Sequence, residues 1–151
     1  MVQWIEAPEQ RAVIARQVLE NLPDWFGIPE SREAYIRGSL TQPFWADMED
    51  GVVRGFLALK ETSPHTAELA VMGVLPQYHR QGVGKALFEA FRQYARAEGY
   101  SFLQVKTVRE GCYGSYDRTN AFYKSLGFRE LECFPTLWDE ENPCQIYVMT
   151  V

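Results

Sequence analysis

The stretch VLPQYHRQGVGKAL, residues 74–87, constrains the fold more than any other part of the 151-residue chain. It completes a nearly apolar segment, TAELAVMGV, that is typical of a central strand. Pro76 begins a loop, and Gly82 and Gly84 permit a tight turn and a close approach of the backbone to a ligand. Apolar residues at helical spacing follow. The stretch therefore predicts a strand, a glycine-rich turn and a helix whose free N–H groups favour an anion.

Two common phosphate-binding patterns do not fit this turn. A nucleoside-triphosphate loop, G-x-x-x-x-G-K-[ST], would need glycine at His79 and a hydroxyl at Ala86. A dinucleotide fingerprint, G-x-G-x-x-G, would need glycine or alanine at Leu87. These mismatches disfavour a nucleotide-binding protein. On the residues alone, one alternative remains: the loop binds no anion, and its basic side chains are merely solvated.

Strand and helix signals along the chain predict the order β-α-α-β-β-β-α-β-α-β-β. The first strand is expected in VQWIEA, and two helices in PEQRAVIARQVLENL and PESREAYIRGSL with an aromatic loop between them. Asp50-Gly51 predicts a tight hairpin turn, and Gly99 and Gly127 are expected to end the two later helices. The fold class is therefore α/β of the α+β type. We expect a mixed, mostly antiparallel sheet of about seven strands flanked by about four helices.

Composition and charge exclude several functional classes. A net charge of −5 disfavours a nucleic-acid binder. No apolar run approaches the length of a membrane span, and MVQWIEAPEQ lacks the basic and apolar regions of a signal peptide. The three cysteines and two histidines form no metal-binding pattern, and Cys112 has no evident histidine partner that would make it a nucleophile. We expect a cytoplasmic protein with reduced thiols, no metal, no nucleic-acid partner and no membrane association.

Two motifs resemble those of the GCN5-related N-acetyltransferase (GNAT) family. The first, V-x-P-x-Y-x-R-x-G-V-G-K-x-L, resembles its acetyl-CoA loop and is formed by Val74, Pro76, Tyr78, Arg80, Gly82, Val83, Gly84, Lys85 and Leu87. The second, TNAFYKSLGF at residues 119–128, resembles the late A-x-x-x-Y-x-x-x-G-F helix and strand of the family. His79 departs from the Q/R that opens the family loop. The resemblance implies that residues 1–151 form a single GNAT acetyltransferase domain.

The resemblance also implies acetyl-CoA, or coenzyme A, as the co-substrate. The pyrophosphate is expected on the glycine turn, and the pantetheine arm on the strand before it, where the fourth and fifth strands of the family splay apart. The residues that this assigns to cofactor binding are Met72, Gly73, Val74, Arg80, Gln81, Gly82, Val83, Gly84 and Lys85.

The implied reaction is direct attack of a primary amine on the acetyl thioester. Tyr123 matches the family tyrosine near the sulfur and is the candidate general acid. Glu68 is the candidate general base, acting directly or through water, because strict alternation would place it on one face with Met72 and Val74. Simple ring packing is the alternative for Tyr123. For Glu68 the alternatives are an exposed glutamate at the start of the strand and a glutamate paired with a nearby arginine.

A pantetheine-contacting asparagine, present in many family members, has no clear counterpart in this sequence. The position seven residues before Tyr123 is Tyr116, and Asn120 is only three residues before it. We therefore expect Asn120 to be a solvent-facing helix residue.

The sequence leaves the acceptor open between a small-molecule amine and a peptide or protein amine. The loops PDWFGIPESREAY, VREGCYGSYD and FPTLWDEENPC are rich in aromatic and acidic residues, which would suit a cationic amine. A non-catalytic acyl-CoA-binding or regulatory module is the alternative to an enzyme. The last strand, QIYVMTV, has an apolar edge that is compatible with pairing in a homodimer.

Overall fold

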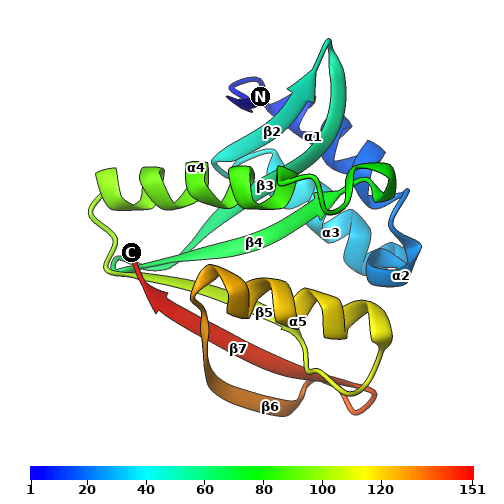
Figure 1. The fold of residues 1–151 in the computed structure, drawn as a ribbon, viewed down its shortest axis with the longest axis vertical. Coiled ribbons are helices and arrows are strands. Elements are labelled where there is room, and N and C mark those ends of the chain that lie inside the picture. Colours follow the sequence, from blue (N-terminus) through cyan, green and yellow to red (C-terminus); the bar gives the residue numbers. More distant parts are fainter.

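The computed structural model describes all 151 residues and contains one seven-stranded sheet (Figure 1). The strands are β1 (Val2–Trp4), β2 (Phe44–Glu49), β3 (Val52–Ser63), β4 (Thr66–Val74), β5 (Phe102–Val108), β6 (Arg129–Asp139) and β7 (Asn142–Thr150). Their order in the sheet is β1-β2-β3-β4-β5-β7-β6, and β4–β5 is the single parallel pair. The predicted mixed, mostly antiparallel sheet is confirmed.

Five α-helices flank the sheet, one more than the sequence indicated. They are α1 (Pro8–Leu19), α2 (Pro23–Phe26) and α3 (Pro29–Ser39) on one face, and α4 (Val83–Ala97) and α5 (Gly114–Leu126) on the other (Figure 1). The additional helix, α2, is a single turn within the predicted aromatic loop. Pro23 favours this turn because the φ angle of proline suits the first helical position. None of the helices is long and apolar enough to cross a membrane.

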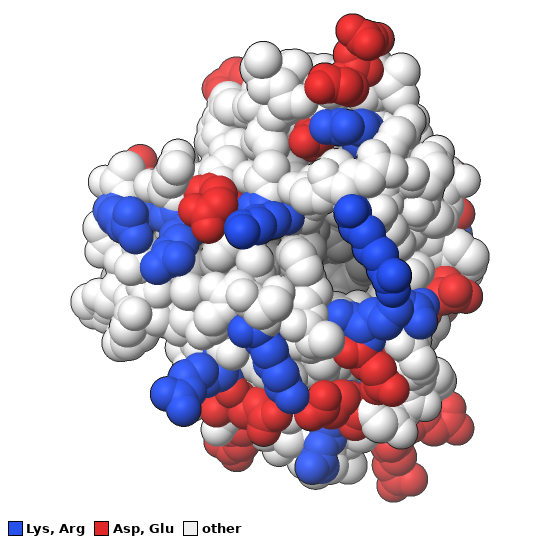
Figure 2. All heavy atoms as spheres, in the orientation of Figure 1, with Lys and Arg blue, Asp and Glu red and all other residues white.

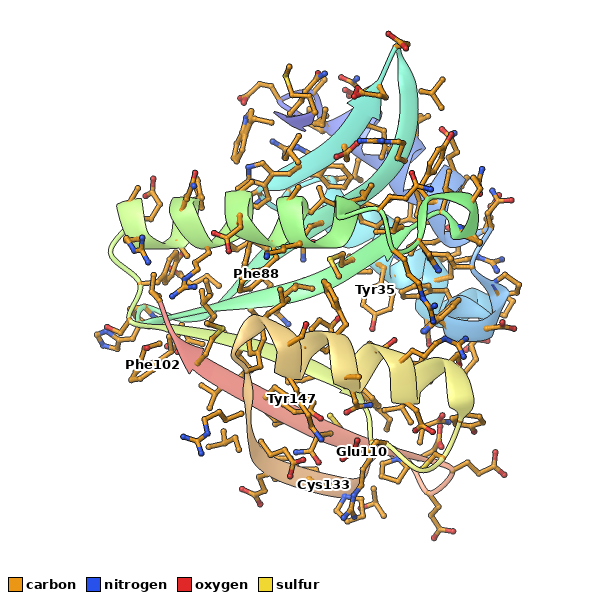
Figure 3. The ribbon with its side chains drawn as sticks, in the orientation of Figure 1. Tyr35, Phe88, Phe102, Glu110, Cys133 and Tyr147 are labelled. Atoms are coloured by element: carbon orange, nitrogen blue, oxygen red, sulfur yellow. The ribbon has the colours of Figure 1, made fainter.

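Each face of the sheet carries its own hydrophobic core. On the α4–α5 face, Phe88 and Phe91 of α4 pack among the buried side chains of β3, β4 and β5, and Figure 3 shows Phe88 pointing from α4 to the sheet. On the α1–α3 face, Val18 and Leu19 of α1 pack on β2, β3 and β4. Because the central strands are covered on both faces, they read as nearly continuous apolar runs.

The last strand of the chain is not an edge of the sheet. β7 pairs with β5 on one side and with β6 on the other. The prediction of a free β7 edge for homodimer pairing is therefore wrong, and β6 is the edge strand. Burial explains the order: residues 144–147 of β7 are all buried, whereas no residue of β6 is. The more apolar strand takes the interior place.

Candidate active site

β4 and β5 are paired over only the first part of their length. Parallel pairing runs from Thr66 and Phe102 to Leu69 and Val105, and beyond this point β4 is paired with β3 alone. The two strands then diverge, as Figure 1 shows. The backbone of residues 70–74 consequently has polar groups on its β5 side that the sheet does not use. This is the splay that the family resemblance predicted.

A cleft of about 720 Å³ passes through the splay and opens on both faces of the sheet. On one face it is lined by the loop between β4 and α4, the start of α4 and the inner side of α5. On the other face it is lined by α2, α3, the end of β6 and the first residue of β7. We call these two halves the cofactor half and the acceptor half, after the roles that the family resemblance implies for them. Figure 2 shows a hollow in the middle of the α4–α5 face with Lys and Arg side chains at its border.

The cleft collects nearly all of the residues that the sequence assigned to acetyl-CoA. Eight of the nine line it: Met72, Gly73, Val74, Arg80, Gly82, Val83, Gly84 and Lys85. The ninth, Gln81, does not, because its side-chain amide donates to the Gln77 carbonyl at 3.0 Å. The β4–α4 segment thus presents a contiguous surface to the cofactor half.

The backbone of the loop is shaped to bind an anion. Arg80 and Gly82 adopt positive φ angles of 61° and 80°, a conformation that turns successive N–H groups into one concavity. The first hydrogen bond of α4 runs from Ala86 N to Gly82 O at 3.0 Å, so the N–H groups of residues 83–85 have no acceptor in the helix. These N–H groups and the positive end of the helix dipole, with the charge of Lys85, suit a pyrophosphate.

His79, the departure from the family pattern, ties the loop to the end of β4. Its Nε2 lies 2.6 Å from the carbonyl oxygen of Val74. A carbonyl oxygen only accepts hydrogen bonds, so Nε2 carries the hydrogen. The imidazole ring also meets the ring of Trp25 in α2 edge-on, with the centroids 6.0 Å apart. His79 therefore anchors the loop, while the backbone N–H groups remain directed at the ligand site.

Tyr123 packs its ring in the core and also lines the cleft. The residue is 6% exposed, and its ring contacts those of Phe128 and Tyr147. Burial raises the pKa of Tyr123 well above the ordinary tyrosine value, and Tyr35 and Tyr116 raise it further. The phenol is therefore protonated at neutral pH and can donate a proton. The ring packing of Tyr123 is therefore observed, and it does not keep the residue from lining the cleft.

Glu68 does not share a face with Met72 and Val74, and the alternation argument for it is wrong. The register between β3 and β4 shifts at Ala70, which is the extra residue of a bulge. As a result Leu69 packs in the same core as Met72 and Val74, although a regular strand would put residues 69 and 72 on opposite faces. Glu68, the neighbour of Leu69, faces the α1–α3 side instead.

On that side Glu68 is buried and bound to β5. Its Oε1 accepts a hydrogen bond from Gln104 Nε2 at 2.8 Å and lies 3.2 Å from Lys106 Nζ. Lys106 lines the cleft and Glu68 does not. The side chain of Tyr35 points from α3 toward the cleft (Figure 3). Burial is the largest cause that raises the pKa of Tyr35, and the charge of Glu68 is the second. The carboxylate therefore lies behind the acceptor half, one contact away from the cleft.

Asn120 is fully buried, so the prediction that it faces solvent is wrong. Its amide donates to the carbonyls of Val108 at 2.9 Å and Tyr116 at 2.7 Å, and its Oδ1 accepts the Tyr147 hydroxyl at 2.6 Å. Asn120 thus ties α5 to β5 and β7. Tyr116 lines the cleft, and its hydroxyl donates to the Trp25 carbonyl at 2.8 Å. Burial is the main cause that raises the pKa of Tyr116 to about 12.

The acceptor half has the predicted aromatic walls but not the predicted carboxylates. Trp25 and Trp138 are among the aromatic residues that line it. Of the acids in the three loops only Asp139 lines the cleft, and its Oδ1 accepts the backbone N–H groups of Glu141 and Asn142 in the β6–β7 turn. Lys106 also lines the cleft and was not predicted, because a lysine within a strand carries no local sign of a site.

Comparisons with known proteins agree with this geometry. The model of the family described as "Acetyltransferase (GNAT) domain" matches residues 41–130, more than half of the chain. The peptidyl-lysine N-acetyltransferase YiaC of Escherichia coli (strain K12) is 28% identical over 123 residues, which cover 82% of this chain and 70% of that protein.

Solved structures share the fold over the whole chain. A GNAT-family protein from Desulfovibrio desulfuricans superimposes with a TM-score of 0.84 at 20% identity and covers 99% of this chain and 98% of its own. A GNAT-family acetyltransferase from Elizabethkingia anophelis with acetyl-CoA bound gives a TM-score of 0.72 at 16% identity, covering 100% and 97%. Because the family model matches residues 41–130, which include β4, α4 and β5, the chain belongs to the GNAT family of acetyltransferases.

Proposed function

We propose that this protein transfers the acetyl group of acetyl-CoA to a primary amine of a peptide or protein, with a lysine side chain as the leading acceptor. The observation that carries the proposal is the cleft through the β4–β5 splay, which joins an anion-binding loop on one face to an aromatic entrance on the other. The E. coli relative named as a peptidyl-lysine N-acetyltransferase supports a polypeptide acceptor. An aromatic wall without free carboxylates suits the aliphatic stem of a lysine better than a polycation.

The cofactor half offers binding groups for each part of acetyl-CoA. The N–H groups of residues 82–85 are proposed to hold the pyrophosphate, with Arg80 and Lys85 supplying positive charge. The backbone of Met72, Gly73 and Val74 is proposed to hydrogen-bond the pantetheine amides as a neighbouring strand would, through the polar groups on its β5 side other than the Val74 carbonyl, which His79 occupies. The structure of the E. anophelis family member with acetyl-CoA bound supports this co-substrate.

In the proposed reaction the amine nitrogen attacks the acetyl carbon directly. The N–C bond forms, the C–S bond breaks, and the nitrogen loses one proton while the thiolate gains one. Tyr123 is proposed to protonate the thiolate, because it lines the cleft and a tyrosine hydroxyl carries its proton at neutral pH. Glu68 is proposed as the base that receives the amine proton. Since the carboxylate does not line the cleft, this transfer needs a bridging water.

Calorimetry with acetyl-CoA and a thiol-release assay with a panel of amines test the function. The panel contains a lysine peptide with a blocked N-terminus, a peptide with a free N-terminus and no lysine, and small alkyl amines. We expect micromolar or tighter acetyl-CoA binding and the fastest thiol release with the lysine peptide. Absence of binding would refute the function, and binding without turnover of any amine would favour the non-catalytic module. Faster turnover of the small amines would move the acceptor to that class.

We further propose a cytoplasmic location, which the three unpaired cysteines support. Cys112 is exposed and lies outside the cleft lining, so it has no part in the proposed reaction.

A further inference from the structure

We propose that Trp25 spans the open end of the β4–β5 splay and makes the acceptor entrance a closed frame. On the proposed acetyl-transfer function, on which this inference rests, the frame selects amines carried on a slender, unbranched stem. Trp25 is thus a specificity-determining and positioning residue of the acceptor half.

Three hydrogen bonds fasten Trp25 to α5. The indole Nε1 donates to Thr119 Oγ1 at 3.0 Å and also points to the Ser115 carbonyl at 3.3 Å, and the Trp25 carbonyl accepts the Tyr116 hydroxyl at 2.8 Å. Ser115, Tyr116 and Thr119 lie 90, 91 and 94 residues after Trp25 in the sequence. A single-turn helix therefore reaches across the cleft and is held there from both its backbone and its side chain.

The other side of Trp25 contacts the cofactor loop. Its ring meets the His79 ring edge-on, and His79 Nε2 is bound to the Val74 carbonyl at the end of β4. Contacts therefore run without interruption from β4 through His79 and Trp25 to α5. Figure 1 shows α2, the end of β4 and the first turns of α5 together at the side of the molecule where the splay widens.

This arrangement determines how an acceptor can enter. A splay closed only by the Leu69–Val105 pair would be a notch, open at its far end, into which a branched amine could be laid sideways. With Trp25 across that end, the acceptor half is bounded there as well as at the Leu69–Val105 pair, with Tyr35 and Trp138 among its other walls. An amine must then pass end-on, so branching beside the nitrogen meets the frame.

The test compares two isomeric amines, 1-aminopentane and 3-aminopentane, through the ratio of their kcat/KM values. Trp25→Ala removes the indole that spans the splay, and Thr119→Val keeps the indole but removes the nearer of its two hydrogen-bond acceptors, leaving the Ser115 carbonyl. Trp4→Phe is the matched control, because Trp4 is a half-exposed tryptophan whose indole donates to Glu6 outside the cleft. Thermal denaturation of each variant reports whether the fold is retained.

We expect the wild type to prefer the linear amine and Trp25→Ala to improve the relative kcat/KM of the branched amine at least about tenfold, the value of roughly two newly accommodated CH₂ groups. Thr119→Val should move the ratio in the same direction by about three- to tenfold, as expected for one hydrogen bond, and Trp4→Phe should leave it unchanged. A parallel loss for both amines in both cleft variants would overturn the inference, because a merely structural residue lowers turnover without changing selectivity. Wild-type turnover of 1-aminopentane and of the lysine peptide tests the function itself and is independent of the ratio.

Discussion

The cofactor half and the acceptor half of the cleft are built in opposite ways. The cofactor half comes from one contiguous stretch, residues 72–85, together with the inner side of α5, and the contiguous stretch presents mainly backbone N–H and C=O groups. The acceptor half comes from α2, α3, β5, the end of β6 and the first residue of β7, and presents side chains that are brought together by long-range contacts. A backbone site tolerates a changed side chain such as His79. A side-chain site depends on each partner and has no local motif.

We expect the largest loss of kcat from a substitution at Tyr123, where the two halves of the cleft meet. Tyr123→Phe should lower kcat about 10²- to 10⁴-fold, the usual contribution of a general acid, and leave the acetyl-CoA Kd within about twofold. Because the pKa of Tyr123 is raised, the wild-type loss of kcat from its ionisation should occur only above about pH 10 and be absent in the variant. Stopped-flow turnover and calorimetry measure both. Tyr113→Phe, outside the cleft lining, is the control, and an unchanged kcat in Tyr123→Phe would exclude the acid role.

The next effect tests whether Glu68 serves the acceptor half chemically. Glu68→Gln should lower kcat/KM about 10²-fold at neutral pH and move the pH–rate profile to higher pH, because only amine already deprotonated in solution would react. Lys106→Gln removes the ion-pair partner but keeps the carboxylate. Equal shifts of the profile in both variants would show that the β4–β5 ion pair matters and would reject the base role.

A backbone change should weaken the cofactor half alone. Gly82→Ala places an L-residue at a φ of 80°, with a strain of about 1–2 kcal/mol, so the acetyl-CoA Kd should rise about 5- to 30-fold while the acceptor KM is unchanged. Gly111→Ala introduces the same kind of strain at a φ of 94° outside the cleft lining. If both variants lost affinity equally in calorimetry, strain in the fold would account for the effect.

The smallest functional effect is expected behind the cleft, in the buried network of Asn120. Tyr147→Phe leaves the Asn120 Oδ1 unpaired and should lower the free energy of unfolding by about 1–3 kcal/mol in urea titrations, with kcat and both binding constants retained. Burial also raises the pKa of Tyr147 above its unfolded value near 10. Its phenol therefore contributes stability up to about pH 10 that is lost as the pH rises through the folded pKa. The variant should lack this alkaline loss, and a variant with wild-type stability at neutral pH would contradict the network.

Local signals predicted much of the fold and the cofactor half. The Asp50-Gly51 turn has φ angles of 51° and 79°, as a tight hairpin requires. Gly127 caps α5 as predicted, and the predicted Gly99 directly follows the Glu98 cap of α4. The turn at residues 80–85 and Tyr123 of α5 line the same cleft, as the two motifs indicated. Each of these features depends on residues that are neighbours in the chain, so periodicity and turn chemistry describe them.

Features that depend on partners far along the chain could not be predicted in this way. The bulge at Ala70 follows from the register with β3 and reverses the face of Glu68. Asn120 is a polar helix residue by pattern and becomes a buried bridge only because Val108 and Tyr147 lie beside it. Nothing local distinguishes these residues from ordinary surface positions.

The sequence by itself determined the order of the elements, the anion-binding turn before α4 and the place of Tyr123 on α5, because helix starts, glycine turns and apolar periods are local properties of a chain. Only the tertiary structure decided that β7 lies inside the sheet, that Glu68 faces the acceptor side with Lys106, and that Trp25 reaches α5. These outcomes depend on burial and hydrogen bonds between segments up to 94 residues apart. The packing of the two cores on the sheet brings these segments together, and the acceptor half of the cleft depends on that packing.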